Sequence, residues 1–161
     1  MNESHTPLYT NNASSEFLSD LNKPNFTQQQ LSNFSTQALE TIQQQQNFNI
    51  NHPPIAIYRI ATEGSQTLKG GVIKQTTSQI EFTLTDGSQV RAAHKGDFIE
   101  YADGTRAQIV TAAGESNSHI ALVGSYLSNG DQIINTPLGS TLLIERQGVP
   151  FPADFLPKTE R

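Results

Sequence analysis

The sequence predicts a small, mainly β protein in which three similar hairpin units form a wedge or cone with approximate threefold symmetry, behind a polar, partly helical extension. One observation is a five-residue pattern, A-x-x-G-(S/D), that occurs three times at spacings of 32 and 28 residues. Its copies begin at Ala61, Ala93 and Ala121 and contain Gly64, Gly96 and Gly124. A period near 30 residues is typical of one small unit used several times. The other observation is that all 11 glycines lie between Gly64 and Gly148.

Composition narrows the classes of protein to which the chain can belong. Its 161 residues predict one domain with an appendage, and 35% hydrophobic and 16% charged residues predict a small core. The net charge is −5 without a basic cluster, which argues against nucleic-acid and anionic-membrane partners. There is no cysteine, so disulfides and thiolate chemistry are excluded. No apolar run reaches membrane-spanning length and no signal peptide is visible, so we expect synthesis in the cytoplasm and export, if any, by a dedicated machine.

Residues 1–54 form an Asn/Gln-rich extension with one or two short helices. A first helical pattern follows Ser14 and stops at Pro24, and Thr27 with Gln30 forms a T-x-x-Q capping box for a second. One apolar stripe continues this second helix, and it consists of Leu31, Phe34, Ala38, Leu39 and Ile42. The stripe either packs on the chain's own β core or docks on another protein, or the segment is disordered. Prolines at 53 and 54 end the helical region.

Residues 55–147 have the period of β-strands. Residues 55–61 are β-branched and apolar, and residues 80–84 alternate between apolar and polar side chains. Asp86-Gly87 and Asp103-Gly104 each lie between two such segments and predict hairpin turns, the second joining residues 98–101 to 106–110. Further short strands are predicted at 120–123, 133–134 and 142–144. None is long enough to be stable alone, so we expect the three units to share one core.

Residues 148–161 form a Pro-rich tail that predicts an extended strap. Its prolines at 150, 152 and 157 exclude a helix. Phe151, Phe155 and Leu156 are the residues expected to hold the strap on the core.

The second copy of the repeat carries a resemblance to a known family. Residues 91–97 read R-A-A-H-K-G-D, which is similar to the P-A-A-R-x-G-D signature of the PAAR-repeat proteins. Ala92, Ala93, Gly96 and Asp97 match the signature, whereas Arg91 replaces the proline and His94 the arginine. Many members also have H-G-G after the first copy, where this chain has L-K-G-G at 68–71. The resemblance covers about residues 55–147.

The resemblance implies a function as the tip of a type VI secretion spike. PAAR-repeat proteins cap the trimeric valine-glycine-repeat (VgrG-type) spike, one copy per trimer, and link or accompany an effector. A base with free strand edges would suit such a trimer, because unpaired edge groups bind partners. We therefore expect a non-enzymatic tip that waits in the bacterial cytoplasm and is delivered into the target cell. Residues of the stripe are the candidates for binding cargo or spike.

Family members commonly hold zinc near the tip with histidines and a cysteine, but this sequence lacks that set. Lys69 stands at the H-G-G histidine, and charged lysine is a poor zinc ligand. His94 and His119 with Asp97 are the remaining weak candidates, so we expect no zinc and no other cofactor. A nucleophile needs a base and an orienting group in a recognised arrangement, and Ser118-His119 is not in one.

Two other classes of function stay open. One is a stand-alone β module that binds cell-wall carbohydrate, although the chain has no tryptophan for a stacking platform. The other is a small effector enzyme carried by the same apparatus. A stoichiometry of one chain per spike trimer would separate the tip from both.

Overall fold

The computed structural model describes residues 7–23 and 26–157. These residues divide into two compact units. The hairpin unit contains residues up to Asn11, Tyr58–Leu143 and residues from Phe151 onward, and the helical unit contains Asn12–Ile57 and Ile144–Pro150. Residues 1–6 and 158–161 of the predicted extension and tail, and the predicted helix stop at Pro24, lie outside the described residues.

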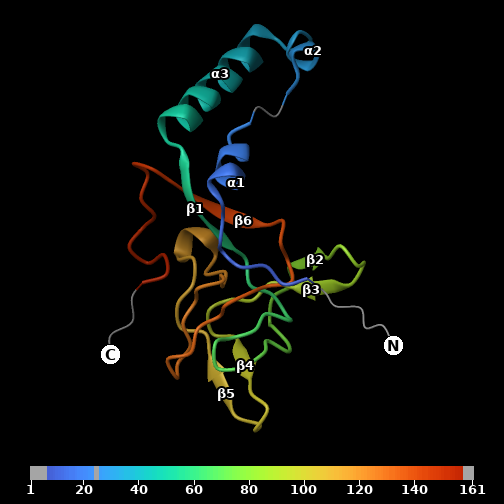
Figure 1. Ribbon diagram of the computed structural model, residues 1–161, viewed down its shortest axis with the longest axis vertical. Helices are drawn as coiled ribbons and strands as arrows, with labels where there is room; N and C mark the ends of the chain where they lie inside the picture. The colour runs from blue at the N-terminus through green and yellow to red at the C-terminus, as the bar shows by residue number, and fades with distance from the viewer. Residues whose placement is uncertain (1–6, 24–25, 158–161) are drawn as a thin grey trace. The chain divides into compact units, whose positions relative to one another are not determined.

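The helical unit contains three α-helices, and each begins after a side-chain cap. Figure 1 labels them α1, α2 and α3. α1 (Ser15–Asp20) begins after Ser14, whose hydroxyl accepts from the Phe17 N–H. α2 (Gln28–Leu31) begins with the predicted capping box, in which Thr27 and Gln30 each bond the other's backbone. α3 (Thr36–Asn51) is the longest helix and ends just before the two prolines, as predicted.

One continuous helix through the apolar stripe was expected, and that prediction is wrong. α2 ends at Leu31, and α3 begins at Thr36 after a cap at Ser35. The physical reason is local hydrogen bonding by serine. The Ser32 hydroxyl donates back to the Gln29 carbonyl at 2.7 Å, and the Ser35 hydroxyl accepts from the Ala38 N–H at 3.1 Å. Both bonds favour helix ends over a helix interior.

The strands form three two-stranded sheets. β1 (Pro54–Arg59) pairs with β6 (Leu142–Arg146). β2 (Glu81–Thr83) pairs antiparallel with β3 (Gln89–Arg91), with Phe82 opposite Val90. β4 (Phe98–Glu100) pairs antiparallel with β5 (Arg106–Gln108), with Ile99 opposite Ala107. Both hairpins with a D-G turn, β2–β3 and β4–β5, are therefore as predicted (Figure 1).

The prediction of a mainly β protein is correct only in part. The described residues form a small mixed but sheet-rich fold, with three α-helices, one short 3-10 helix (Glu115–Asn117) and three two-stranded sheets. Segments 120–123 and 133–134, predicted as strands, make only isolated bridges. Ile120 meets His94, Leu122 meets Ile60, and Ile133 meets Thr67. Each residue meets a different neighbour, so no ladder extends along these segments.

The hairpin unit contains two apolar clusters. The first is built from the three repeat alanines and the hairpin side chains, and its buried members are Ala61, Ile73, Ala93, Ile99, Ala107, Ile109, Ala121, Leu127 and Ile133. The second includes Ile60, Leu122 and Leu138 and receives the strap residues Phe155 and Leu156. The Phe155 ring stacks on Phe151 at 3.8 Å between centroids. Of the three residues expected to hold the strap on the core, Phe155 and Leu156 pack on this cluster. The strap is not extended throughout, because the Phe155 N–H donates to the Pro152 carbonyl in a turn and Leu156 has a φ of 42°.

Candidate functional site

The three A-x-x-G-(S/D) segments have the same local structure. In each one the last residue accepts a hydrogen bond from the N–H three positions earlier. Ser65 accepts from Thr62 at 3.1 Å, Asp97 from His94 at 2.8 Å and Ser125 from Leu122 at 3.0 Å. The glycines adopt positive φ angles of 95°, 97° and 109°, which side chains disfavour. The repeated pattern is therefore one turn made three times.

The alanines that open these turns bond to one another in a closed cycle. The N–H of Ala61 donates to the carbonyl of Ala121 at 3.0 Å, Ala121 donates to Ala93 at 2.8 Å, and Ala93 donates to Ala61 at 2.9 Å. All three side chains are fully buried in the first cluster. Three chain segments converge here, so only a small side chain fits. Ala92, the other signature alanine, is also fully buried.

A hairpin follows each turn and ends at a buried isoleucine. The first hairpin is residues 65–73, the second is residues 97–109 and contains β4 and β5, and the third is residues 125–133. The glycine N–H of each repeat donates at 2.8 Å to the carbonyl of that isoleucine, and the pairs are Gly64 with Ile73, Gly96 with Ile109, and Gly124 with Ile133. The three hairpin ends share one turn, closed by the bonds Thr67–Gly71, Tyr101–Thr105 and Leu127–Asp131. The middle hairpin is longer on both strands. Lys69, Tyr101 and Asn129 each lie five positions after a repeat glycine, and this spacing predicts that they are equivalent. In the structure Lys69 is instead equivalent to Asp103 and Asn129.

Hydrogen bonds also join neighbouring hairpins. Between the second and third, Val110 N–H donates to Tyr126 at 2.9 Å and Ser128 N–H to Gln108 at 2.8 Å. Between the third and first, the same pattern links Ile134 to Gln66 and Leu68 to Gln132, both at 2.9 Å. Between the first and second, Glu100 donates to Val72 at 3.0 Å and Val72 to Glu100 at 2.9 Å. Backbone hydrogen bonds thus join each hairpin to both of the others.

The ends of the hairpins meet at the carboxylate of Asp131, which is only 1% exposed. Its Oδ2 accepts from the Thr67 hydroxyl at 2.5 Å and from the Tyr101 hydroxyl at 2.6 Å. Its Oδ1 accepts from the N–H groups of Lys69 at 2.9 Å and Gln132 at 2.8 Å. One carboxylate thereby joins all three hairpins, and its hydrogen-bonding capacity is used.

This environment shifts two pKa values. Burial opposes ionisation of Asp131, but the hydrogen bonds from Thr67, Tyr101 and two backbone amides outweigh it, so the carboxyl pKa is lowered. The pKa of Tyr101 is raised, first by burial and then by donation to the Asp131 carboxylate. At neutral pH this cluster holds one carboxylate and one neutral phenol. It is a structural cluster whose groups are already paired.

The candidate metal ligands His94 and His119 come from neighbouring segments but do not form a metal site with Asp97. The Asp97 carboxylate, which is 4% exposed, is occupied by hydrogen bonds from His94 N–H and the Thr77 hydroxyl. His119 and Ser118 both have a φ of 56° in an exposed loop. Within residues 7–23 and 26–157 no group of three His, Asp or Glu side chains could hold a metal ion.

The stripe residues are divided among three places in the helical unit. Leu31 ends α2, Phe34 lies between the helices, and Ala38, Leu39 and Ile42 lie on α3. The described helices bury no residue, and the Phe34 ring packs edge-on against Phe26 at 5.1 Å. The most exposed apolar side chain of the unit is Ile50 at 71%, against 37% for Leu39. Ile50 was missed because it lies among Asn and Gln.

Comparison with known proteins gives no relative: no protein-family model, no curated protein and no solved structure matches the chain. Among the described helices, none has the length and apolar character needed to cross a membrane.

Proposed function

We propose that the chain is the non-enzymatic tip of a contractile injection spike of the type VI secretion kind. The hairpin unit would be a small wedge with approximate threefold symmetry, seated on a trimeric VgrG-type spike. The observation that carries this proposal is the closed cycle of hydrogen bonds among Ala61, Ala121 and Ala93. A cycle in which each repeat donates to one neighbour and accepts from the other is what three units around an axis require.

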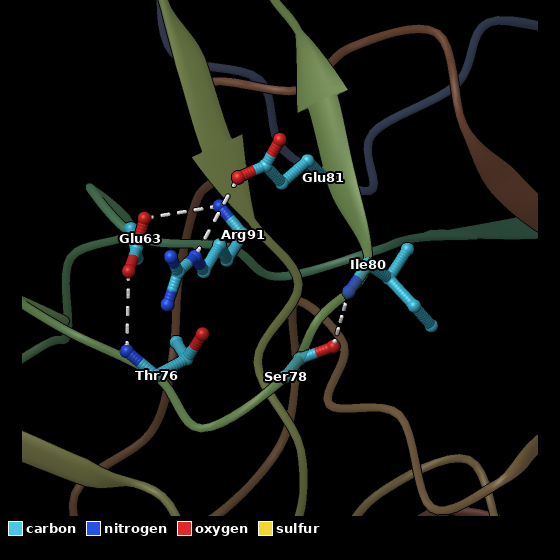
Figure 2. Close-up of polar contacts among 6 residues, drawn as sticks. All are labelled: Glu63, Thr76, Ser78, Ile80, Glu81 and Arg91. Atoms are coloured by element: carbon cyan, nitrogen blue, oxygen red, sulfur yellow. Dashed lines mark hydrogen bonds and ion pairs between the residues drawn. The ribbon is translucent and has the colours of Figure 1, made fainter.

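The departures from the PAAR signature are compatible with this architecture. The positions that match have structural roles: Ala93 is buried at the convergence of the repeats, Gly96 has positive φ and Asp97 caps its own turn. At the two positions that differ, backbone N–H groups donate to carboxylates, and the Arg91 side chain also pairs with Glu81 at 3.7 Å (Figure 2). Arg91 N–H donates to Glu63 at 3.0 Å, and His94 N–H donates to Asp97. A proline at 91 would lose the first of these bonds.

The cluster at the hairpin ends supports a tip that needs no zinc. Members of the family commonly hold zinc near the tip. Here the Asp131 carboxylate joins Thr67, Tyr101 and its own hairpin through hydrogen bonds. Charge-assisted hydrogen bonds to a buried carboxylate are individually strong, so four of them can fix the three ends without a metal.

The test is stoichiometry. The full chain is mixed with the trimeric VgrG-type protein encoded beside it, and the mass of the complex is measured by light scattering. We expect one copy per three spike chains. An Ala93→Asp variant, which puts a carboxylate where the repeats converge, should lose the complex together with its fold. Asp103→Asn, at an exposed hairpin end, is the folded control. A stable monomer that never binds the trimer contradicts the proposal.

We propose further that α3 and the segment before it bind the effector or adaptor. Leu39 and Ile50 are exposed apolar side chains on α3, so they offer contact area to a partner. Co-purification of cargo with a Leu39→Ser, Ile50→Ser double variant should fall at least tenfold. Gln43→Ser and Gln44→Ser on the same helix are matched controls. Unchanged cargo recovery by the double variant would remove this role, with the seating on the spike unaffected.

The proposed life cycle follows from these roles. The chain would be stored in the bacterial cytoplasm and leave it only with the spike. It would bind protein partners and neither nucleic acid nor membrane.

A further inference from the structure

Three positions after the buried isoleucine of each hairpin lies a residue that we call the exit of that hairpin: Thr76, Ala112 or Thr136. Two of these exits bind a segment near one end of the chain. At the third hairpin, Thr136 pairs with Tyr9 through two backbone bonds of 2.8 and 3.0 Å. At the second hairpin, the carbonyl of Ala112 accepts from the N–H of Leu156 at 2.8 Å. Both chain ends thus donate a backbone N–H to the carbonyl of an exit residue. Tyr9 does so from an extended segment that forms a β-bridge, and Leu156 does so from a turn in which its φ is 42°.

The corresponding exit of the first hairpin is Thr76, and no extended segment covers it. Its N–H donates to the Glu63 carboxylate at 3.2 Å, as Figure 2 shows, but its carbonyl accepts no hydrogen bond from the described residues. Its hydroxyl lies in a side chain that is 4% exposed and also has no partner among them. Buried polar groups are nearly always paired, so Thr76 points to a missing partner.

The free space beside the repeat glycine also differs from one exit to another. A methyl group on Gly124 would lie 3.6 Å from the strap residue Leu156, and one on Gly64 would lie 3.2 Å from Pro137. A methyl group on Gly96 would meet nothing within 4 Å. Gly96 adjoins the exit at Thr76, because the Asp97 carboxylate accepts from the neighbouring Thr77. The uncovered exit therefore has open space where the others hold a leucine or a proline.

The ladder between hairpins is also incomplete at this one junction. Val110 and Ile134 each donate to the next hairpin, to Tyr126 and Gln66, but the equivalent bond from Lys74 to Phe98 is absent from the described residues. A depression of about 250 Å³ lies here. It is lined by Thr76, Thr77, Gly96, Phe98, Glu100 and Arg106.

We propose that this depression beside Thr76 is a docking site for an extended segment of another protein chain. A backbone N–H of the segment would donate to the Thr76 carbonyl, as Leu156 does to Ala112, and an apolar side chain or proline would lie over Gly96. The two segments already in equivalent positions define this chemistry. The inference concerns a different surface from α3, and it does not depend on which partner the hairpin unit caps.

The probe is a synthetic peptide copying residues 150–157, the segment that covers the second exit. It is titrated to 5 mM into the ¹⁵N-labelled full chain, with chemical shifts followed by NMR. We expect shifts concentrated at Thr76, Gly96 and Phe98. Shifts confined to Ala112 and Gly124 would mean that the peptide displaces the chain's own strap, and they would overturn the proposal. Absence of shifts, also with a second peptide copying residues 7–11, would do the same.

Two substitutions of equal backbone strain locate the site. Gly96→Asn fills the space over the first exit, and Gly104→Asn has a similar φ, 88° against 97°, with nothing within 4 Å, at the end of a hairpin. Peptide affinity should fall at least tenfold in the first and stay unchanged in the second. Equal affinity in both would refute the assignment. Self-association of the chain that Gly96→Asn abolishes would give the site to a second copy instead.

Hydrogen exchange tests the same junction without a ligand. The amide of Lys74 should exchange at least tenfold faster than those of Val110 and Ile134, because Lys74 makes no backbone hydrogen bond to the next hairpin whereas the other two do. Equal protection at the three junctions would contradict the open exit.

Discussion

Replacement of Asp131 by Asn should weaken the joint between the three hairpins while preserving the shape of the side chain. Oδ1 can remain an acceptor for Lys69 and Gln132. The new amide at the other position donates, so it meets the hydroxyls of Thr67 and Tyr101 as a donor. Thr67 already accepts from the Gly71 N–H at 2.8 Å, so its hydroxyl proton is left without a buried acceptor.

The magnitude follows from the number of groups left unpaired. A hydrogen bond to a charged group contributes about 1.5–3 kcal/mol, and an orphaned buried polar group costs about 1–3 kcal/mol. Two charged bonds are lost at Oδ2, and both hydroxyls must find weaker arrangements. The two losses overlap, so we expect Asp131→Asn to lower the free energy of unfolding by about 3 kcal/mol at neutral pH. Tyr101→Phe removes one of the two bonds and should cost about 1–2 kcal/mol.

Urea unfolding of the full chain, followed by circular dichroism, measures these values, and a double-mutant cycle of the two substitutions isolates their coupling. The pH profile supplies an independent check. Because the folded-state pKa of Asp131 is lowered, its contribution is present above the unfolded pKa and lost as pH falls through the folded pKa. The acid slope should therefore shrink in Asp131→Asn. A variant within about 0.5 kcal/mol of the parent, with an unchanged acid slope, would refute the idea that this carboxylate joins the hairpins.

Three further predictions use the same unfolding assay. Gly71→Ala should cost about 3 kcal/mol, because its methyl would lie 2.5 Å from Ile99. Gly70→Ala has open space and should cost only the ~1–2 kcal/mol of its positive φ, so equal losses would contradict the packing. Ala93→Val overfills the convergence of the repeats and should cost about 1–3 kcal/mol, measured as a lower urea midpoint. Above pH 10 the raised pKa of Tyr101 should add a loss of stability as pH rises through its folded value, and this loss should disappear in Tyr101→Phe.

Local features of this fold could be predicted from the sequence because their causes are local. The Thr27–Gln30 capping box and the turn at Asp86-Gly87 depend on residues a few positions apart. The interruption at residues 32–35 has a local cause too, but the apolar spacing through it concealed the competing serine bonds. The prediction of strands at 120–123 and 133–134 was wrong for a non-local reason, because the residues of each segment pair with different parts of the chain.

The candidate sites differ in how much of each could be predicted from the sequence. The repeat itself identified Ala61, Ala93 and Ala121, but their cyclic bonding depends on the path of the whole chain. Asp131 was missed because a lone aspartate after N-G reads as an ordinary turn residue. Its contact with Tyr101 also depends on the greater length of the second hairpin. That length changes which residues of the three hairpins are equivalent, so the repeat spacing does not predict the contact. The uncovered exit at Thr76 is defined by a difference among three equivalent places, and no single segment of sequence contains that difference.

The asymmetry of the exits has a structural origin in the first repeat. Between the first hairpin and the second copy of the turn, the chain makes a long excursion that contains β2 and β3. The Glu63 carboxylate holds both ends of this excursion, accepting from Thr76 where it leaves and from Arg91 where it returns (Figure 2). We expect this clamp to hold residues 74–76 away from Phe98, because the bond from Lys74 to Phe98 is absent from the described residues. Loss of the clamp in Glu63→Gln should therefore slow hydrogen exchange at Lys74, if the chain then closes onto Phe98 as it does at the other two junctions; unchanged exchange would place the cause of the opening elsewhere.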